Sequence, residues 1–126
     1  MAICARTAST FEEAAAHIHK ATGHKVFHEA MDVTDSTAVA AFVAEVEAPF
    51  GRVDICVTNS GGPPSNVFKN TKPEDWRSAF DQLLMSTICF ARETLPRMQK
   101  NKKGRLITIT SSAVIAVDGG LVRSLL

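Results

Sequence analysis

The sequence contains no tyrosine and a single tryptophan, and its other aromatic residues are seven phenylalanines. No phenol is therefore present to donate or accept a proton. Three cysteines, an odd number, stand far apart in apolar runs at Cys4, Cys56 and Cys89. This pattern favours structural thiols in a reducing compartment over disulfides. His17 and His19 are two residues apart and point in different directions on a helix, so we expect no metal site.

Long apolar runs and strong net charge are also missing. No stretch reaches the ~18 apolar residues of a membrane span, and the first ten residues lack the apolar core of a secretory signal. The formal net charge is +1, which gives no support to nucleic-acid binding. We therefore expect a cytoplasmic location, with neither nucleic acid nor a membrane as a partner.

Short apolar runs alternate with helix signals along the chain. Strands are expected over 1–6, 25–33, 53–59 and 104–112, and helices over 9–23, 34–51 and 72–100. Ser9 or Thr10 is expected to cap the first helix, and Asp35 or Ser36 the second. The 126 residues suit one domain. This order of elements predicts an α/β fold with a parallel sheet.

Polar or glycine-rich residues follow every predicted strand. In parallel sheets, ligands bind outside the carboxyl ends of the strands. Gly61 and Gly62 permit close approach to the main chain, and the two prolines after them stop the strand. Each loop alone is explained as an ordinary turn, but four on one rim favour a ligand-binding edge. The four are Arg6-Thr7, Asp32-Val33, Asn59-Ser60-Gly61-Gly62 and Thr110-Ser111-Ser112.

Several motifs, in this order and spacing, resemble the short-chain dehydrogenase/reductase family: DVTD at 32–35, TNSGG at 58–62 and GRLITITSS at 104–112. The segments NSGGPP, PEDWRSAF, LLMSTI and LPRM resemble its atypical branch of 3-oxoacyl-acyl-carrier-protein reductase-like proteins. The resemblance implies an α/β, partial Rossmann-like, doubly wound parallel sheet with family strands 2 to 5, the first strand missing. Residues 1–126 would form one partial NAD(P)-binding domain.

The resemblance implies a set of cofactor-binding residues. Arg6 would pair with the 2′-phosphate of NADP, with NAD as the other possibility, although a cation that merely closes a strand explains it equally well. Asp32 would accept from the adenine amino group and the main chain of Val33 would meet the ring, with helix capping as the alternative for Asp32. Asn59, Ser60 and Gly61 stand at the family's Asn-Asn-Ala-Gly motif. There Asn59 would support the neighbouring strand and Gly61 would let the cofactor ribose lie against the main chain.

The resemblance also implies the reaction: reduction of a small carbonyl or acyl substrate by hydride transfer from NADPH. Ser111 would hydrogen-bond the substrate carbonyl, although a strand-end turn also explains a serine there. Ser124 occupies the place of the family's proton-donating tyrosine, and a serine hydroxyl is a poor acid. Leu83 falls where the family has a proton-relaying asparagine. The full-length form is expected to be a homo-oligomer.

Two features of the family are expected to be absent from this chain. The sequence has no counterpart of the glycine-rich phosphate loop, and the family's first strand belongs between the strands at 1–6 and 53–59. We expect the gap to be closed by direct pairing of those two strands or by a strand from a partner chain. The chain as given is then an impaired or inactive fragment of the oxidoreductase, or a catalytically dead relative that associates with an intact paralogue.

Overall fold

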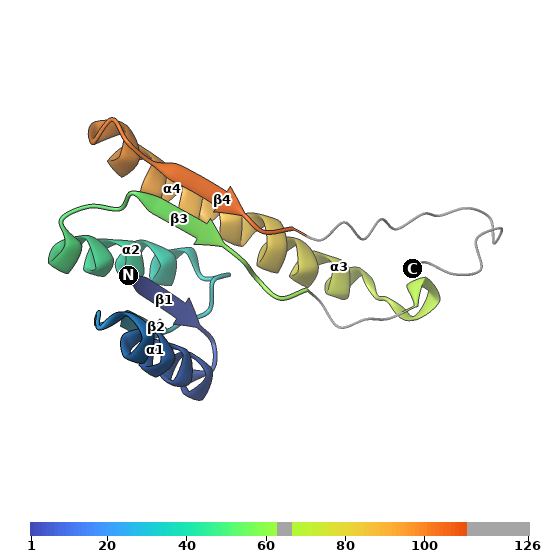
Figure 1. Cartoon of the computed structure of the whole chain (residues 1–126). Coiled ribbons are helices and arrows are strands. Elements are labelled where there is room, and N and C mark those ends of the chain that lie inside the picture. The colour runs from blue at the N-terminus through green and yellow to red at the C-terminus, as the bar shows by residue number, and fades with distance from the viewer. Residues whose placement is uncertain (63–66, 111–126) are drawn as a thin grey trace.

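The computed structural model describes residues 1–62 and 67–110. Four strands alternate with helices, as Figure 1 shows, so the α/β prediction is confirmed. The strands are β1 (Ala2–Ala5), β2 (Phe27–Ala30), β3 (Ile55–Thr58) and β4 (Arg105–Thr108). The helices are α1 (Ala8–Thr22), α2 (Ser36–Phe50), α3 (Pro73–Phe80) and α4 (Ser86–Lys100), with a 3₁₀ turn at Phe68–Asn70 and a π-turn at Asp81–Met85.

The strands form two separate parallel pairs. β1 pairs with β2, with Ala2 opposite Phe27, and β3 pairs with β4, with Thr58 opposite Thr108. In the described residues no hydrogen-bonded pairing joins β1 to β3, although their arrows run in the same direction in Figure 1. Direct pairing across the missing strand, one of the two expected solutions, is therefore not adopted.

The helices cover the two pairs of strands from different sides. α1 packs on β1 and β2, where the Phe11 ring lies 5.1 Å from the ring of His28. α2 packs against α4, which in turn packs on β3 and β4. A hydrophobic core cluster lies between α2 and the first pair of strands, and its buried members are Met31, Val39 and Phe42. The core thus holds the two sheets together through helices rather than through strand pairing.

Side-chain capping at one end and a left-handed glycine at the other set the boundaries of α2. The Asp35 carboxylate accepts hydrogen bonds from the main-chain N–H groups of Thr37 and Ala38, at 2.8 and 3.2 Å. Gly51 ends the helix in the left-handed region, at φ 72°, which glycine adopts without a steric penalty. α1 differs slightly from expectation: it begins at Ala8 after Thr7, whose side chain makes no cap, instead of after Ser9 or Thr10.

Replacing Asp35 by alanine removes the acceptor for two main-chain N–H groups at the start of α2. We expect the free energy of unfolding to fall by about 1 kcal/mol, the usual cost of losing such a cap. Urea denaturation followed by circular dichroism measures this change. Asp35→Asn is the matched control, because asparagine keeps an acceptor oxygen at the same place. Equal losses in both variants would mean that charge, and not capping, is responsible.

The third predicted helix, 72–100, is interrupted. α3 and α4 are joined by the π-turn, whose last turn is held by two hydroxyls: Ser86 Oγ donates to the Gln82 carbonyl at 2.5 Å, and Thr87 Oγ1 donates to the Leu83 carbonyl at 3.1 Å. Pro96 lies inside α4, which nevertheless continues to Lys100. None of the helices in the described part of the chain combines the length and the apolar character needed to cross a membrane.

Candidate functional site

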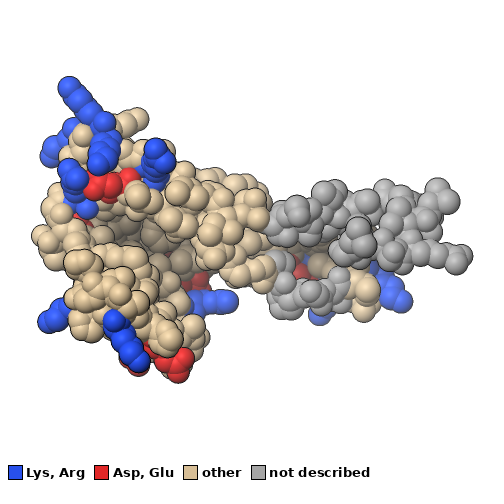
Figure 2. Space-filling model, in the orientation of Figure 1, with Lys and Arg blue, Asp and Glu red and all other residues tan. Residues whose placement is uncertain are grey.

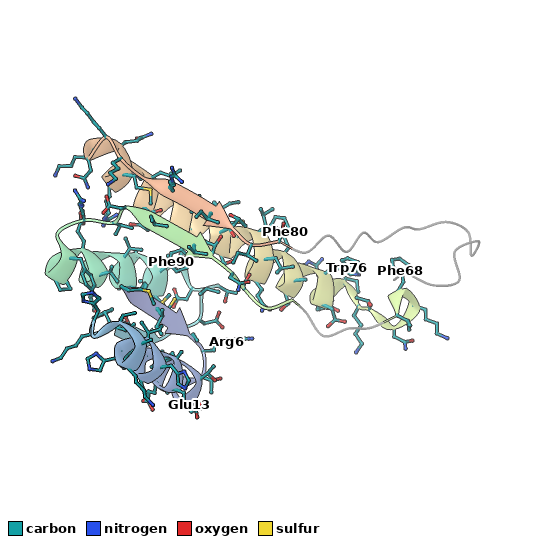
Figure 3. The ribbon with its side chains drawn as sticks, in the orientation of Figure 1. Arg6, Glu13, Phe68, Trp76, Phe80 and Phe90 are labelled. Carbon is teal, nitrogen blue, oxygen red and sulfur yellow. The ribbon has the colours of Figure 1, made fainter. Side chains whose placement is uncertain are left out.

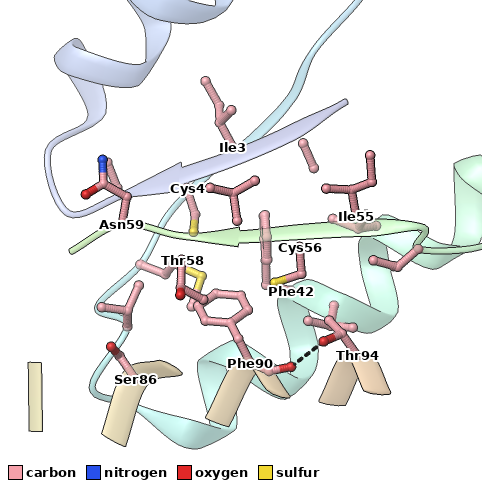
Figure 4. Close-up of a pocket in the computed structure, with 18 of the residues that line it drawn as sticks. Ile3, Cys4, Phe42, Ile55, Cys56, Thr58, Asn59, Ser86, Phe90 and Thr94 are labelled. Atoms are coloured by element: carbon pink, nitrogen blue, oxygen red, sulfur yellow. Dashed lines mark hydrogen bonds between the residues drawn. The ribbon is translucent and has the colours of Figure 1, made fainter. Parts of the chain in front are cut away.

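A groove of about 990 Å³ runs between the two sheets, where no strand joins β1 to β3 in the described residues. Its two walls are the facing edges of β1 and β3, and α2 and α4 close it from below. Figure 4 shows Phe42 and Phe90 reaching toward it from the helices, and Figure 2 shows the surface hollowed at this place. Residues that line it from the helices are Phe42, Val43, Val46, Phe50, Gln82, Ser86, Phe90 and Thr94.

Both strand walls direct main-chain groups into the groove. The carbonyls of Met1 and Ala5 accept from β2, and those of Asp54 and Thr58 accept from β4. Because main-chain groups of successive residues in a parallel strand point to opposite sides, those of Ala2 and Cys4 on β1 and of Ile55 and Val57 on β3 face the groove. The groove therefore combines polar strand edges with an apolar floor.

The predicted cofactor-binding residues gather at one end of this groove, where β1, β2 and β3 end. Figure 3 shows Arg6 at the tip of β1. Asp32 lies beside the groove, between two residues that line it. The predicted residues that line the groove itself are Arg6, Val33, Asn59, Ser60 and Gly61. Three loops far apart in sequence thus meet at one rim, which is the juxtaposition that the strand-end polarity predicts.

The Asp32 side chain is exposed, and hydrogen bonds within its own loop fix its position. Its Oδ1 accepts from the Thr34 main-chain N–H at 2.9 Å and from the Thr34 hydroxyl at 2.8 Å. These bonds hold the pKa of the Asp32 carboxyl below its usual value, and the charge of Arg6 adds to the effect. Since Asp35 provides the cap of α2, the capping alternative for Asp32 is not adopted.

The rim continues from β3 to β4. The Ile109 main-chain N–H donates to the Thr58 carbonyl at 2.9 Å, so the parallel pairing extends past the end of β4. Residues 59–62 and 109–110 therefore leave the sheet on the same edge. Ser111 and Ser124, the predicted catalytic serines, lie outside the described residues. Leu83, at the place of the family's asparagine, belongs to the π-turn, and its side chain is exposed.

Two thiols border the groove and stay protonated at neutral pH. Burial raises the pKa of the Cys4 thiol to about 11, with smaller contributions from Cys56 and Glu29. Burial also raises the pKa of Cys56, against an opposing hydrogen bond with Thr94. Cys4, Cys56 and Cys89 are all free thiols, and the described residues hold no cluster of three or more metal-binding side chains. Cys4 and Cys56 therefore line the groove as small, uncharged side chains.

Sequence reasoning missed a polar network beneath the rim. Thr87 Oγ1 lies 3.3 Å from Thr58 Oγ1, and Thr58 Oγ1 lies 3.1 Å from Thr108 Oγ1, so the three hydroxyls form a hydrogen-bonded chain. Gln82 Nε2 donates to the Gly61 carbonyl at 2.5 Å. A threonine near the end of each predicted strand was the only signal available, and threonine is common in strands for packing reasons alone.

Parallel strands, covering helices and a polar rim at the strand ends define a Rossmann-like α/β protein. The family model for short chain dehydrogenase matches residues 1–120, and the chain belongs to that family. The 3-oxoacyl-[acyl-carrier-protein] reductase FabG of Escherichia coli strain K12 is 31% identical over 90 residues, which are 71% of this chain and 37% of that protein. Nodulation protein G of Azospirillum brasilense is 32% identical over 111 residues, 86% of this chain and 45% of that protein.

A solved structure shows the same arrangement. The L-sorbose reductase of Gluconobacter frateurii, complexed with NADPH and L-sorbose, superimposes with a TM-score of 0.77 at 29% identity, over 85% of this chain and 41% of that one. The chain therefore spans less than half the length of these relatives. The similarity confirms the predicted family and the Rossmann-like fold.

Proposed function

We propose that the chain carries the adenosine end of an NADP site in an oxidoreductase that reduces a small carbonyl or acyl compound by hydride transfer. The observation that supports this proposal is the meeting of three strand-end loops at one end of the groove. The known relatives add support, since one is complexed with NADPH and another is named as a 3-oxoacyl-[acyl-carrier-protein] reductase.

The residues at the rim fit the adenosine end of NADP. Arg6 is an exposed cation beside the groove, and its fork of N–H groups suits a 2′-phosphate. Its charge already acts on Asp32 across the two loops, so both groups are within electrostatic reach of one ligand. Val33 offers main chain for the adenine ring, and Gly61 leaves space for the ribose, since a Cβ added there meets no atom closer than 4.0 Å.

The bound cofactor would supply the hydride, and the chain's own residues would bind and orient the cofactor and the substrate. Ser111 is proposed to hydrogen-bond the substrate carbonyl oxygen as it gains negative charge. Ser124 is proposed to stand near the same oxygen, in the position of the family's acid. Residues 1–126 include no glycine-rich phosphate loop, so the rim by itself would hold the nucleotide weakly.

Exposed apolar side chains along α3 and the π-turn support association of the full-length form into a homo-oligomer. Trp76, Phe80 and Leu84 are 44%, 52% and 47% exposed, and Figure 3 shows Trp76 and Phe80 on α3, which extends beyond the carboxyl ends of the strands. Exposed apolar side chains that lie together favour association. A cytoplasmic location remains part of the same proposal.

The 2′-phosphate provides the sharpest test of the proposed cofactor. Titrations of the 126-residue chain with adenosine 2′,5′-bisphosphate and adenosine 5′-monophosphate, followed by NMR, give both dissociation constants. We expect the bisphosphate to bind about tenfold or more tightly, because a charge-assisted hydrogen bond contributes about 1.5–3 kcal/mol. Arg6→Gln should remove the preference.

Arg52→Gln is the matched control for that test. Arg52 lines the same groove and pairs with Asp54 at 2.9 Å. Its replacement by glutamine therefore removes one positive charge from the groove, as Arg6→Gln does, but at a place away from the rim. The preference should survive this change. Equal affinities for the two nucleotides in the unaltered chain would contradict the proposed NADP site. Because binding is weak, micromolar NADPH should not raise the melting temperature measurably.

A further inference from the structure

The loop after β3 is fastened to the long helical segment by one side chain. Gln82 Nε2 donates to the main-chain carbonyl of Gly61 at 2.5 Å, across 21 residues of sequence. The Gln82 side chain is half-buried and lines the groove together with Gly61. A bond to the main chain fixes the path of the loop, whatever side chains the loop carries.

Gln82 belongs to the π-turn Asp81–Met85. A π-turn contains one more residue than an α-helical turn, so it rotates the side chains that follow relative to those before. Here the carbonyls of Gln82 and Leu83 are satisfied by the hydroxyls of Ser86 and Thr87, and Ser86 is only 3% exposed. The turn is therefore supported by one partly buried hydrogen bond, from Ser86, and one exposed hydrogen bond, from Thr87.

The same turn also fixes the base of the loop. The hydroxyl of Thr87, which donates to the Leu83 carbonyl in the π-turn, also lies at hydrogen-bond distance, 3.3 Å, from the hydroxyl of Thr58, the last residue of β3. The Thr58 hydroxyl in turn lies 3.1 Å from the hydroxyl of Thr108 on the neighbouring strand. The loop is thus attached at Thr58 and again at Gly61, and both attachments lead to residues 82–87.

We propose that Gln82 is a positioning residue, which sets the main chain of Asn59–Gly61 at the rim and so shapes the place of the nucleotide ribose. It acts through Gly61 and does not take part in the chemistry. The statement about the ribose rests on the proposed NADP function, whereas the statement about the loop does not. The inference assigns a role to a residue that belongs to none of the motifs discussed above.

Gln82→Glu tests the hydrogen bond with almost no change in size. At pH 7 the carboxylate has no N–H to donate and repels the Gly61 carbonyl oxygen. We expect the carbonyl ¹³C signal of Gly61 to move toward the value of a carbonyl without a donor. Below the carboxyl pKa, about 4.3 when unperturbed, the protonated side chain can donate again, so the signal should move back toward that of the unaltered chain.

Gln99→Glu is the matched control, since Gln99 is exposed near the end of α4 and its replacement by glutamate introduces the same charge. It should leave the Gly61 signal unchanged over the whole pH range. Gln82→Met provides a second variant, which lacks both the donor and the charge and should shift the Gly61 signal at every pH. A Gly61 signal that stays unchanged in Gln82→Glu and Gln82→Met would overturn the inference.

The affinity for adenosine 2′,5′-bisphosphate tests the second half of the inference. The dissociation constant should rise about fivefold in Gln82→Glu at pH 7, as expected for one lost hydrogen bond, and should not change in Gln99→Glu. A shifted Gly61 signal with unchanged affinity would overturn the positioning role. If the unaltered chain binds no nucleotide, the proposed function fails, and the Gly61 signal still decides whether Gln82 sets the loop.

Discussion

Replacing Phe42 by alanine is expected to lower the free energy of unfolding by about 3–5 kcal/mol, the usual cost of removing a buried phenylalanine. Phe42 is 6% exposed and belongs to the core cluster with Met31 and Val39. Its ring also lies 5.9 Å from that of Phe27 on β2. Because the two sheets share no strand pairing in the described residues, this helix contact carries much of their connection.

Phe50→Ala on the same helix is the control for that loss. Phe50 is 43% exposed and lines the groove, so its removal should change the free energy of unfolding by less than about 1 kcal/mol. Chemical denaturation of both variants, followed by far-ultraviolet circular dichroism, gives the two values. Similar losses in the two variants would contradict a core that lies between α2 and the first pair of strands.

Alkylation of Cys4 should be about a hundredfold slower in the folded chain than in the unfolded chain at pH 8. The thiolate is the reactive form, and burial raises the pKa of Cys4 to about 11 from 9.0. At pH 8 the folded chain therefore holds the proton that an unfolded cysteine partly releases. Iodoacetamide labelling with peptide-level mass spectrometry measures the rate at Cys4.

The pH dependence separates the raised pKa from simple steric protection. Between pH 9 and pH 11 the unfolded thiol is already ionised while the folded one is still protonated, so the folded state loses stability as the pH rises through this range. The labelling rate of folded Cys4 should accordingly keep rising up to about pH 11. A rate that levels off near pH 9 would contradict the raised pKa.

Much of the fold could be predicted from local chemistry. The parallel pairing of β3 with β4 agrees with the predicted parallel sheet. The apolar run that ends at Thr58 has no polar alternation, which predicted a strand covered on both faces, but α4 packs on one face of β3 and Ile55 and Val57 are 61% and 54% exposed. Asp35, one of the two residues expected to cap the second helix, is the cap of α2, because a carboxylate acceptor for the first main-chain N–H groups is a local requirement. The meeting of Arg6, Val33 and Gly61 at one rim followed from strand direction alone.

The π-turn and the separation of the sheets could not be predicted in this way. The π-turn contains one more residue than an α-helical turn and rotates the side chains relative to one another, and no residue propensity in the segment Asp81–Met85 indicated it. The contact of Gln82 with Gly61 depends on that rotation. Whether β1 would pair with β3 depended on how α2 and α4 pack. The roles of Ser111 and Ser124 stay predictions.

The contacts of the adenine ring test most directly whether the rim is a nucleotide site. Intermolecular nuclear Overhauser effects can be recorded from the adenine protons of bound adenosine 2′,5′-bisphosphate to the methyl and aromatic-ring protons of the chain. The rim formed by the ends of β1, β2 and β3 predicts contacts with the methyl groups of Val33. Contacts with the ring protons of Trp76 and Phe80 instead, on α3 beyond the carboxyl ends of the strands (Figure 3), would contradict it.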